Sequence, residues 1–150
     1  MKHWLFKTEP DTYSIDDLKR EGRCDWEGIR NYQARNRLRD EVQIGDQVLI
    51  YHSSCAEPAV VGLAEVTGGP RPDPSQFHPE SPYYDPKSAA DAPRWVLVQV
   101  RWRENFPSAL TLKAIKADPT FADMELVSRS RLSIQRVSSA AFNAIVKRCH

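Results

Sequence analysis

The sequence predicts one mixed α/β domain spanning residues 1–150, with mostly sequential strands that curl into a small barrel and helices over its ends. Three observations predict this class. A chain of 150 residues suits a single domain with a proper core. Several short runs have the composition and alternation of strands. Between them, stretches with helical apolar spacing begin at recognisable capping residues.

The first strand and the first helix are expected near the N-terminus. Residues 3–7 (HWLFK) are few and rich in aromatic side chains, as is typical of a short strand. Ser14 has the position of an N-cap, Asp17 follows three residues later in the capping-box position, and Gly22 closes the helix.

A second helix is expected from residue 31 or 32 to about residue 40. Ala34 and Leu38 lie four residues apart on its buried side. The following run, residues 47–52 (QVLIYH), is apolar on both faces through its middle and therefore predicts a central strand. The next strand covers residues 59–66 and contains Gly62, a candidate bulge or point of close approach.

A long loop is expected before the last strands and helices. Residues 70–93 contain seven of the eleven prolines, a density at which no regular element is expected, although aromatic residues predict that the loop is pinned to the body. Residues 94–103 (RWVLVQVRWR) alternate clearly as a strand. A short helix at 111–117, a last strand at 132–137 and a helix at 139–149 capped by Ser138 complete the chain.

Composition favours a soluble protein without metal or cofactor. The hydrophobic share is 41% and the charged share is 27%, as in ordinary globular proteins. No apolar run approaches the roughly 18 residues that span a bilayer, and the N-terminal segment lacks the apolar region of a signal peptide. A cytoplasmic monomer with no membrane partner is therefore expected. Three cysteines without CxxC spacing disfavour both a zinc site and a disulfide framework.

No motif in the chain predicts catalysis. The four histidines are scattered, without the spacing of a metal site. His52 precedes two serines at a strand end, but no GxSxG elbow is present and turn chemistry explains such a cluster. Walker A and GxGxxG patterns are absent as well. The sequence therefore predicts a protein that is not an enzyme.

Charge is unevenly distributed, although the net charge is only +1. Residues 57–91 carry six acidic and two basic side chains, whereas no acidic residue follows residue 125. A second basic group comes from the arginines of residues 30–39. Two basic segments around an acidic middle suit a bipolar surface, one face of which meets phosphates.

The segment WEGIRNYQARNRLRD, residues 26–40, is the strongest functional signal. Trp26 stands outside any apolar periodic run, so it either plugs the barrel end or lines a pocket for a planar ligand. An indole wall suits a nucleobase, because base–aromatic stacking contributes about 1–3 kcal/mol per base. Asn31 offers both an acceptor and donors to a base edge. Arg35, Arg37 and Arg39 alternate around the helix and cannot all face one ligand, so at least one of them is expected to be solvated.

Several motifs together resemble the EVE domain family. WLFKTEP at residues 4–10, the segment at 26–40, GDQVLIYHS at 45–53 and YYDPKS at 83–88 resemble that family in order and spacing, as do PRW at 93–95 and SRLSIQRV at 130–137. The resemblance implies a PUA-like β-barrel of five to six strands with surrounding helices. It also implies a non-catalytic reader that binds a flipped modified base, 5-methylcytosine or a related modified cytosine in DNA, in an aromatic pocket.

By position, the resemblance also implies a set of site residues. The base pocket would be formed by Lys7, Thr8, Glu9, Trp26, Asn31, Tyr51, His52, Ser53, Leu132 and Ser133. The mouth and the phosphate contacts would come from Arg30, Tyr32, Arg35 and Arg131. The chain departs from the family pattern at three positions: Thr8 replaces a common Ser, Ala59 a common Gly and Arg136 a usual Pro. The extra methyl of Thr8 would lie at the edge of the pocket, where it would affect which base fits.

Two other functions remain open from the sequence. One is a PUA-like RNA-binding module that recognises modified or structured RNA. The other, less favoured, is an enzyme acting on a modified nucleoside, because a base pocket and a nucleobase active site share their walls. Nucleic acid carrying modified bases is the expected partner, and separately encoded restriction or repair proteins are further candidates.

Overall fold

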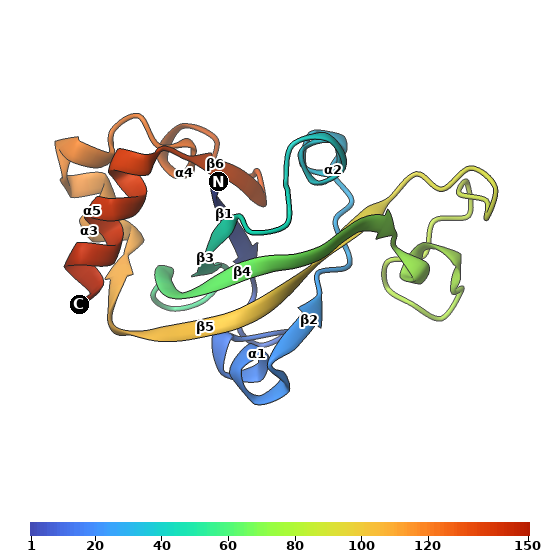
Figure 1. The fold of residues 1–150 in the computed structure, drawn as a ribbon, viewed down its shortest axis with the longest axis horizontal. Helices are drawn as coiled ribbons and strands as arrows, with labels where there is room; N and C mark the ends of the chain where they lie inside the picture. The colour runs from blue at the N-terminus through green and yellow to red at the C-terminus, as the bar shows by residue number, and fades with distance from the viewer.

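One six-stranded sheet organises the protein in the computed structural model, which describes residues 1–150 (Figure 1). The strand order is β2-β5-β4-β3-β1-β6. The strands are β1 (His3–Thr8), β2 (Arg23–Asp25), β3 (Gln47–His52), β4 (Ala59–Pro72), β5 (Val96–Thr111) and β6 (Ile134–Val137). The helices are α1 (Ile15–Glu21), α2 (Tyr32–Asp40), α3 (Leu112–Ala117), α4 (Glu125–Ser128) and α5 (Ser139–Cys149), and Pro74–Phe77 and Pro119–Phe121 form 3-10 turns.

The sheet is mixed and open. β1 lies between β3, to which it is parallel, and β6, to which it is antiparallel. β3, β4 and β5 follow one another as an antiparallel meander, and β2 pairs with β5. Because β2 and β6 are the two edges and do not pair, the predicted closed barrel is not formed. The predicted mixed α/β class is confirmed.

Alternation along the strands separates two hydrophobic cores. In β3, Val48 and Ile50 face the first core, whereas Leu49 and Tyr51 face the second. The first core also receives Trp26 and the apolar faces of α1 and α2, and the second receives α3, α4 and α5. β3 is therefore buried on both faces, as its sequence predicted.

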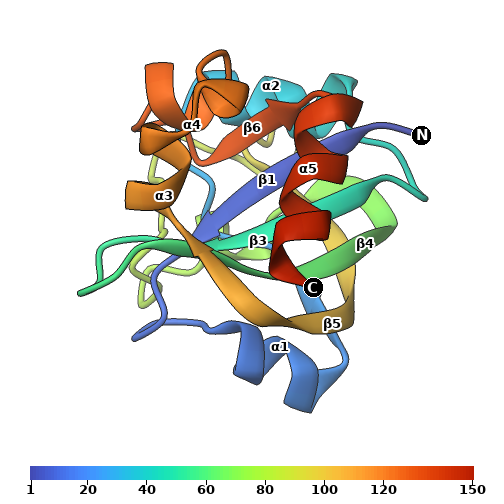
Figure 2. The same cartoon turned by 90° about the vertical axis from the view of Figure 1, so that its left-hand side faces the viewer.

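The two ends of the sheet differ. Helices α3, α4 and α5 gather at one end, and the long segment between β4 and β5 extends from the other (Figure 1). In the perpendicular view, α5 crosses the sheet and α1 lies along β5 (Figure 2). The end without the three helices is where the loop from β2 to α2 meets the segment between β4 and β5.

Three predicted helices begin at capping residues where the sequence predicted their starts. The Ser14 side chain accepts from the Asp17 N–H, and the Asp17 carboxylate accepts from the Ser14 N–H, which forms the complete capping box of α1. The Asn31 side chain caps α2 by accepting from Ala34 at 3.0 Å, and Ser138 caps α5 in the same way. Local hydrogen bonds decide these boundaries, which is why the sequence predicted them.

Several elements were not predicted. β2, α4 and the 3-10 turn at 119–121 were missed, because each is short and lacks a periodic apolar pattern. β4 and β5 are longer than predicted and bend at several register shifts. The prediction of no regular structure within residues 70–93 was wrong at its start, because β4 continues to Pro72 and a 3-10 turn begins at Pro74.

Gly62 is required by close packing at one of these register shifts. A Cβ there would lie 2.6 Å from the Glu104 carbonyl oxygen and 2.8 Å from Cδ1 of Ile15. The β4–β5 pairing shifts register between Val60 and Gly62. The predicted bulge or close approach at this glycine is confirmed.

Arg37 occupies the interior of the protein, a placement that the sequence did not predict. Its side chain is only 3% exposed and makes a two-pronged ion pair with Glu125, at 2.7 and 2.8 Å. It also donates to the Ile134 carbonyl. Burial acts to raise the pKa of Glu125, but hydrogen bonds from Arg37 and from the Arg136 N–H outweigh it and lower that pKa.

Replacing Arg37 should therefore test this ion pair against a matched control. Arg37→Ala leaves Glu125 without its main partner and is expected to lower the free energy of unfolding by about 3 kcal/mol. Arg39→Ala, two residues along the same helix, removes an exposed pair with Asp40 and should cost less than about 0.5 kcal/mol. Urea unfolding followed by circular dichroism measures both. Equal losses in the two variants would contradict the assignment.

Candidate functional site

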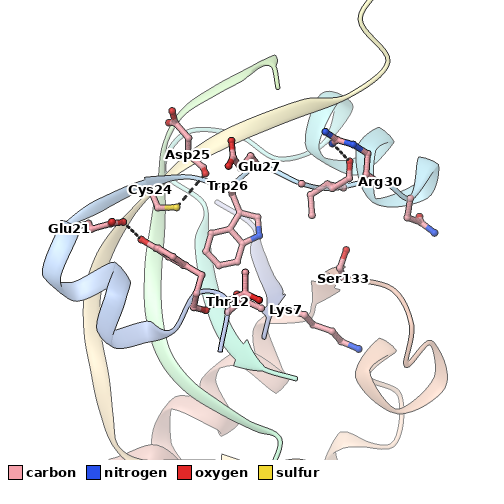
Figure 3. A pocket seen from close by; sticks show the side chains of 14 residues that line it. Lys7, Thr12, Glu21, Cys24, Asp25, Trp26, Glu27, Arg30 and Ser133 are labelled. Carbon is pink, nitrogen blue, oxygen red and sulfur yellow. Dashed lines mark hydrogen bonds between the residues drawn. The ribbon is translucent and has the colours of Figure 1, made fainter. Parts of the chain in front are cut away.

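A cavity of about 550 Å³ opens beside Trp26, where the first core reaches the surface (Figure 3). Three segments line it: the end of β1 with the turn that follows, the segment from the end of α1 to the start of α2, and the residue preceding β6. The Lys7 N–H donates to the Ser133 carbonyl at 3.0 Å, which joins the first segment to the third. The Trp26 N–H donates to the Val98 carbonyl at 2.9 Å, which holds the second segment on β5.

Trp26 belongs both to the core and to the cavity. Its side chain is 6% exposed, with its ring centroid 5.7 Å from that of Phe6 and 6.2 Å from that of Tyr13. Its indole N–H has no hydrogen-bond partner in the protein, whereas the indoles of Trp4, Trp95 and Trp102 donate to Asp46, Asp85 and Asn105. The nitrogen lies on the side of the ring that faces Arg30 and Ser133 (Figure 3). The unpaired donor is therefore available to a ligand.

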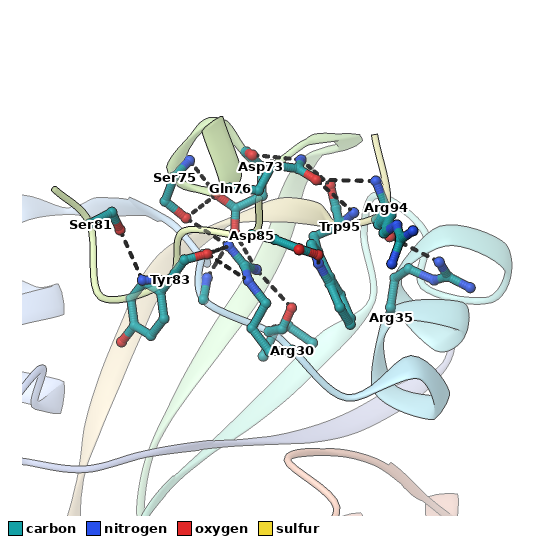
Figure 4. A network of polar contacts seen from close by, with 12 residues as sticks. Arg30, Arg35, Asp73, Ser75, Gln76, Ser81, Tyr83, Asp85, Arg94 and Trp95 are labelled. Atoms are coloured by element: carbon teal, nitrogen blue, oxygen red, sulfur yellow. Dashed lines mark hydrogen bonds and ion pairs between the residues drawn. The ribbon is translucent and has the colours of Figure 1, made fainter. Parts of the chain in front are cut away.

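A buried carboxylate fixes the loop that follows Trp26 (Figure 4). Asp73 accepts from the Gly28 N–H at 2.9 Å, from the Arg30 guanidinium at 3.1 Å and from the backbone and hydroxyl of Ser75. Burial acts to raise the pKa of Asp73, but the hydrogen bonds from Ser75 and Gly28 and the contact with Arg30 outweigh it and lower that pKa. Asp73 therefore remains ionised and ties the β2–α2 loop to the segment after β4.

Tyr83 covers the same loop from outside. Gly28 has a φ of +85°, and a Cβ at this position would lie 2.7 Å from the Tyr83 ring. Arg30 donates to the Tyr83 carbonyl through two of its nitrogens, and its guanidinium lies 5.7 Å from the Tyr83 ring centroid. The segment between β4 and β5 is therefore pinned to the body, as its aromatic residues predicted.

The aromatic and basic residues at the start of α2 stack on one another beside the cavity. Tyr32 stacks on Trp95 with ring centroids 4.7 Å apart. The Arg35 guanidinium lies 4.7 Å from the Tyr32 ring centroid and donates to the Arg94 carbonyl. Tyr32 is nevertheless 50% exposed, so this stack presents an aromatic surface at the N-terminal end of α2.

Charged groups of both signs line the cavity. Lys7 donates to the Ser130 carbonyl, and burial lowers the pKa of its ammonium group. Glu21 accepts from the Tyr13 hydroxyl, and Asp25 accepts from Arg71. The Glu27 carboxylate has no hydrogen-bond partner. Partial burial and the carboxylates of Asp73 and Asp25 raise its pKa.

A shallower groove of about 460 Å³ adjoins the cavity and shares Asn31 with it. Gln33 and residues 128–132 form its remaining lining. Arg129 and Arg131 are exposed in this groove and make no ion pair, whereas Arg136 and Arg148 are paired with Glu41 and Asp118. Of the basic residues after position 125, these two arginines therefore keep free guanidinium groups beside the cavity.

Some of the site residues expected from the sequence come together at the cavity. Its lining includes Lys7, Thr8, Trp26, Asn31 and Ser133, together with Arg30. These residues come from positions 7 to 133 of the chain, and only the sheet and its loops bring them to one place. Arg30 had been expected at the mouth; its guanidinium instead serves mainly to join Asp73 to the Tyr83 segment.

The remaining expected residues lie outside the cavity lining. Tyr51 packs in the second core, and His52 Nε2 accepts from the Ile15 N–H at 3.1 Å, so His52 helps to begin α1. The Ser53 N–H donates to Thr8, and the Glu9 carbonyl accepts in the turn after β1. Leu132 and Arg131 line the adjoining groove, and Tyr32 and Arg35 belong to the stack on Trp95.

The sequence did not single out several other lining residues. Tyr13, Cys24 and Glu27 line the cavity together with further residues of the two N-terminal segments. Glu27 and Gly28 lay within the WEGIRN motif, so the motif itself was a signal for them. Tyr13 and Cys24 carried no such signal, because only the fold brings the turn before α1 next to β2.

The structure contains neither a metal-binding group of side chains nor a helix that could span a membrane. No three His, Cys, Asp or Glu side chains are grouped so that they could bind a metal ion. None of the helices has the length and apolar character needed to cross a bilayer. The cysteines are unpaired, and burial raises the pKa values of the Cys24 and Cys149 thiols.

Fold and site together define a small α/β domain with an open mixed sheet, an aromatic-walled cavity at one end and a basic groove beside it. The family model of the EVE domain matches residues 2–148. The chain therefore belongs to the EVE domain family, and the resemblance seen in its sequence is confirmed.

Known relatives support this assignment over nearly the whole chain. Human Thymocyte nuclear protein 1 is 35% identical over an alignment 164 residues long, which covers 96% of this chain and 72% of that protein. A crystal structure of a Pseudomonas putida protein is 40% identical, with a TM-score of 0.94 and coverage of 99% of both chains. The human THYN1 protein, crystallised in complex with DNA that contains 5-methylcytosine, is 33% identical with a TM-score of 0.95, covering 100% of this chain and 98% of the other. The PUA-like fold class is thereby confirmed.

Substitution of Gly28 should show whether Tyr83 is held against the pocket loop. Gly28→Ala introduces both a strained φ and a clash with the Tyr83 ring, and is expected to lower the free energy of unfolding by about 2–4 kcal/mol. Gly22→Ala has a similar φ of +80° but no atom within 4 Å of the new Cβ, and should cost about 1 kcal/mol. Hydrogen exchange should accelerate in residues 73–95 only in Gly28→Ala; unchanged exchange there would refute the contact.

Proposed function

We propose that this EVE domain is a non-catalytic reader that binds a modified cytosine of DNA, flipped out of its strand, in the cavity beside Trp26. The observation that carries the proposal is the buried indole, which walls a cavity of about 550 Å³ while its N–H remains unpaired. The human THYN1 protein has been crystallised with DNA that contains 5-methylcytosine, which supports modified DNA as the ligand class.

In such a complex, the free-energy cost of extruding the base is similar in size to the gain from stacking and hydrogen bonds. Extruding a base costs a few kcal/mol. Stacking on an aromatic wall contributes about 1–3 kcal/mol, and each new hydrogen bond about 0.5–1.5 kcal/mol. One buried methyl contributes only about 0.8 kcal/mol, or roughly fourfold in affinity. The methyl group alone therefore supports a modest preference, and the remaining affinity has to come from polar contacts and phosphates.

The groove of Arg129 and Arg131 suits the phosphates of the strand that carries the base. It adjoins the cavity through Asn31, and both guanidinium groups are free of acidic partners. Arginine presents a planar set of donors that matches phosphate oxygens. A strand following the groove would bring its base to the mouth of the cavity.

The polar groups near the cavity support binding rather than catalysis. His52 directly precedes two serines in the sequence. Its Nε2 accepts from the Ile15 N–H, and burial lowers the pKa of its imidazole. It is therefore engaged as a neutral acceptor. The Cys24 thiol in the cavity has a raised pKa and donates to the Asp25 carbonyl, which keeps it protonated and weakly nucleophilic.

The four indole N–H groups provide an internal test of the binding site. In ¹H–¹⁵N NMR spectra, adding an oligonucleotide that contains 5-methylcytosine should shift the Trp26 indole signal, because a base placed beside this ring changes the surroundings of an unpaired donor. The indole signals of Trp4, Trp95 and Trp102, each already hydrogen-bonded, should move much less. A shift confined to the latter three signals would place the base elsewhere.

Trp26→Phe extends this test to selectivity. Phenylalanine keeps an aromatic side chain in the core, so the fold should survive, but it shortens the cavity wall and removes the donor. The variant should lose its preference for 5-methylcytosine over cytosine while retaining salt-sensitive binding. An unchanged preference would overturn the proposed pocket. Competition by structured RNA in the same assay separates a DNA reader from an RNA-binding module.

The phosphate groove should be visible in the salt dependence of binding. Each lost phosphate contact lowers the slope of log K against log salt by about 0.7 for a single strand. Arg129→Gln and Arg131→Gln should each weaken binding to modified and unmodified strands alike and reduce the slope by about this amount. Arg148→Gln, which breaks an ion pair with Asp118 instead, should leave the slope unchanged. Identical slopes in all three variants would exclude the groove.

A further inference from the structure

A pocket that recognises only a 5-methyl group cannot tell 5-methylcytosine from thymine. Both pyrimidines carry this methyl group, and they differ at position 4, where cytosine presents an amino donor and thymine a carbonyl acceptor. Thymine is abundant in DNA, so a useful reader has to examine position 4 as well. A carboxylate is the side-chain group that accepts from the cytosine amino group.

Among the acidic side chains of the cavity, Glu27 is the one without a partner. Glu21 accepts from the Tyr13 hydroxyl, and Asp25 accepts from Arg71 and Gln99. Glu27 lines the cavity directly after Trp26 in the chain, on the far side of the indole from Lys7 in Figure 3, and makes no side-chain hydrogen bond. Its acceptor oxygens are therefore free for a ligand.

A second feature of the cavity independently points to a polar ligand. Trp26 is only 6% exposed, yet its indole N–H is unpaired and lies at the cavity. A free donor and a free acceptor from adjacent residues thus line one space. The carboxylates of Asp25 and Asp73, which help to raise the pKa of Glu27, also add negative potential that favours an amino donor over a carbonyl oxygen.

We propose that Glu27 selects a 4-amino pyrimidine over a 4-oxo pyrimidine, an inference that rests on the proposed function of the cavity. The ionised carboxylate accepts a hydrogen bond from the amino group of a cytosine-type base. Opposite thymine or uracil, the same carboxylate faces the O4 lone pairs, and two acceptors without a proton between them repel. Glu27 thus determines which class of pyrimidine binds, and the fit around position 5 determines which modification of that base is preferred.

Binding of four pyrimidines separates selectivity at position 4 from selectivity at position 5. Cytosine, 5-methylcytosine, uracil and thymine combine the two choices at position 4 with the two at position 5. Each is placed at one site of an oligodeoxynucleotide whose other bases are all purines. Fluorescence anisotropy at fixed salt measures binding to the parent protein, to Glu27→Gln and to Glu57→Gln, an equal charge change at an exposed residue that has no side-chain partner.

The parent protein is expected to bind each 4-amino base about tenfold more tightly than the 4-oxo base with the same group at position 5. Glu27→Gln should reduce this ratio to about twofold or less, because an amide offers a donor to O4 and an acceptor to an amino group. Glu57→Gln should keep the parent ratio. Thermal unfolding of the three proteins should coincide, because both substitutions are at the surface.

The inference and the proposed function fail in different ways. A parent protein without a position-4 preference, or a Glu27→Gln variant that keeps it, overturns the role of Glu27 even when the 5-methyl preference is intact. Loss of any 5-methyl effect in both pairs of bases overturns the proposed reading of the modification instead. Binding no better than to an all-purine strand overturns both.

Discussion

The buried carboxylate of Asp73 connects the two segments on which the cavity depends. One oxygen accepts from the Gly28 N–H and from Arg30, and the other from Ser75. Because the side chain is fully buried, water does not compete for these hydrogen bonds. The path of the chain immediately after Trp26 is therefore fixed by a residue that arrives at the end of β4, far along the sequence.

Trp26 shows how a core residue can also serve a ligand. The apolar part of the ring packs against Phe6 and Tyr13, which holds it in one orientation. Its N–H is left without a protein partner, which a fold tolerates where solvent or a ligand can supply the acceptor. A rigid wall with an exposed polar edge costs little to organise on binding, because its conformational entropy is already lost in folding.

Much of the fold was predictable because it depends on near neighbours in the chain. The capping box of Ser14 and Asp17 and the alternation of residues 47–52 are local patterns, and the structure has both where they were predicted. At the candidate site, the sequence pointed to Trp26 and Asn31 through an unusual local composition. The family resemblance added Lys7, Thr8 and Ser133, which the fold does bring to the same cavity.

The sequence by itself determined the helix caps, the central strand and the aromatic motif, since each is encoded within a few neighbouring residues. Tertiary structure decided which charged and polar side chains are free. Arg37 is buried because Glu125, 88 residues along the chain, lies opposite it, and His52 is engaged because α1 begins at its ring. Arg71 pairs with Asp25, whereas the carboxylate of Glu27, two residues further along, has no partner. Such partners are chosen by long-range packing, which no local pattern records.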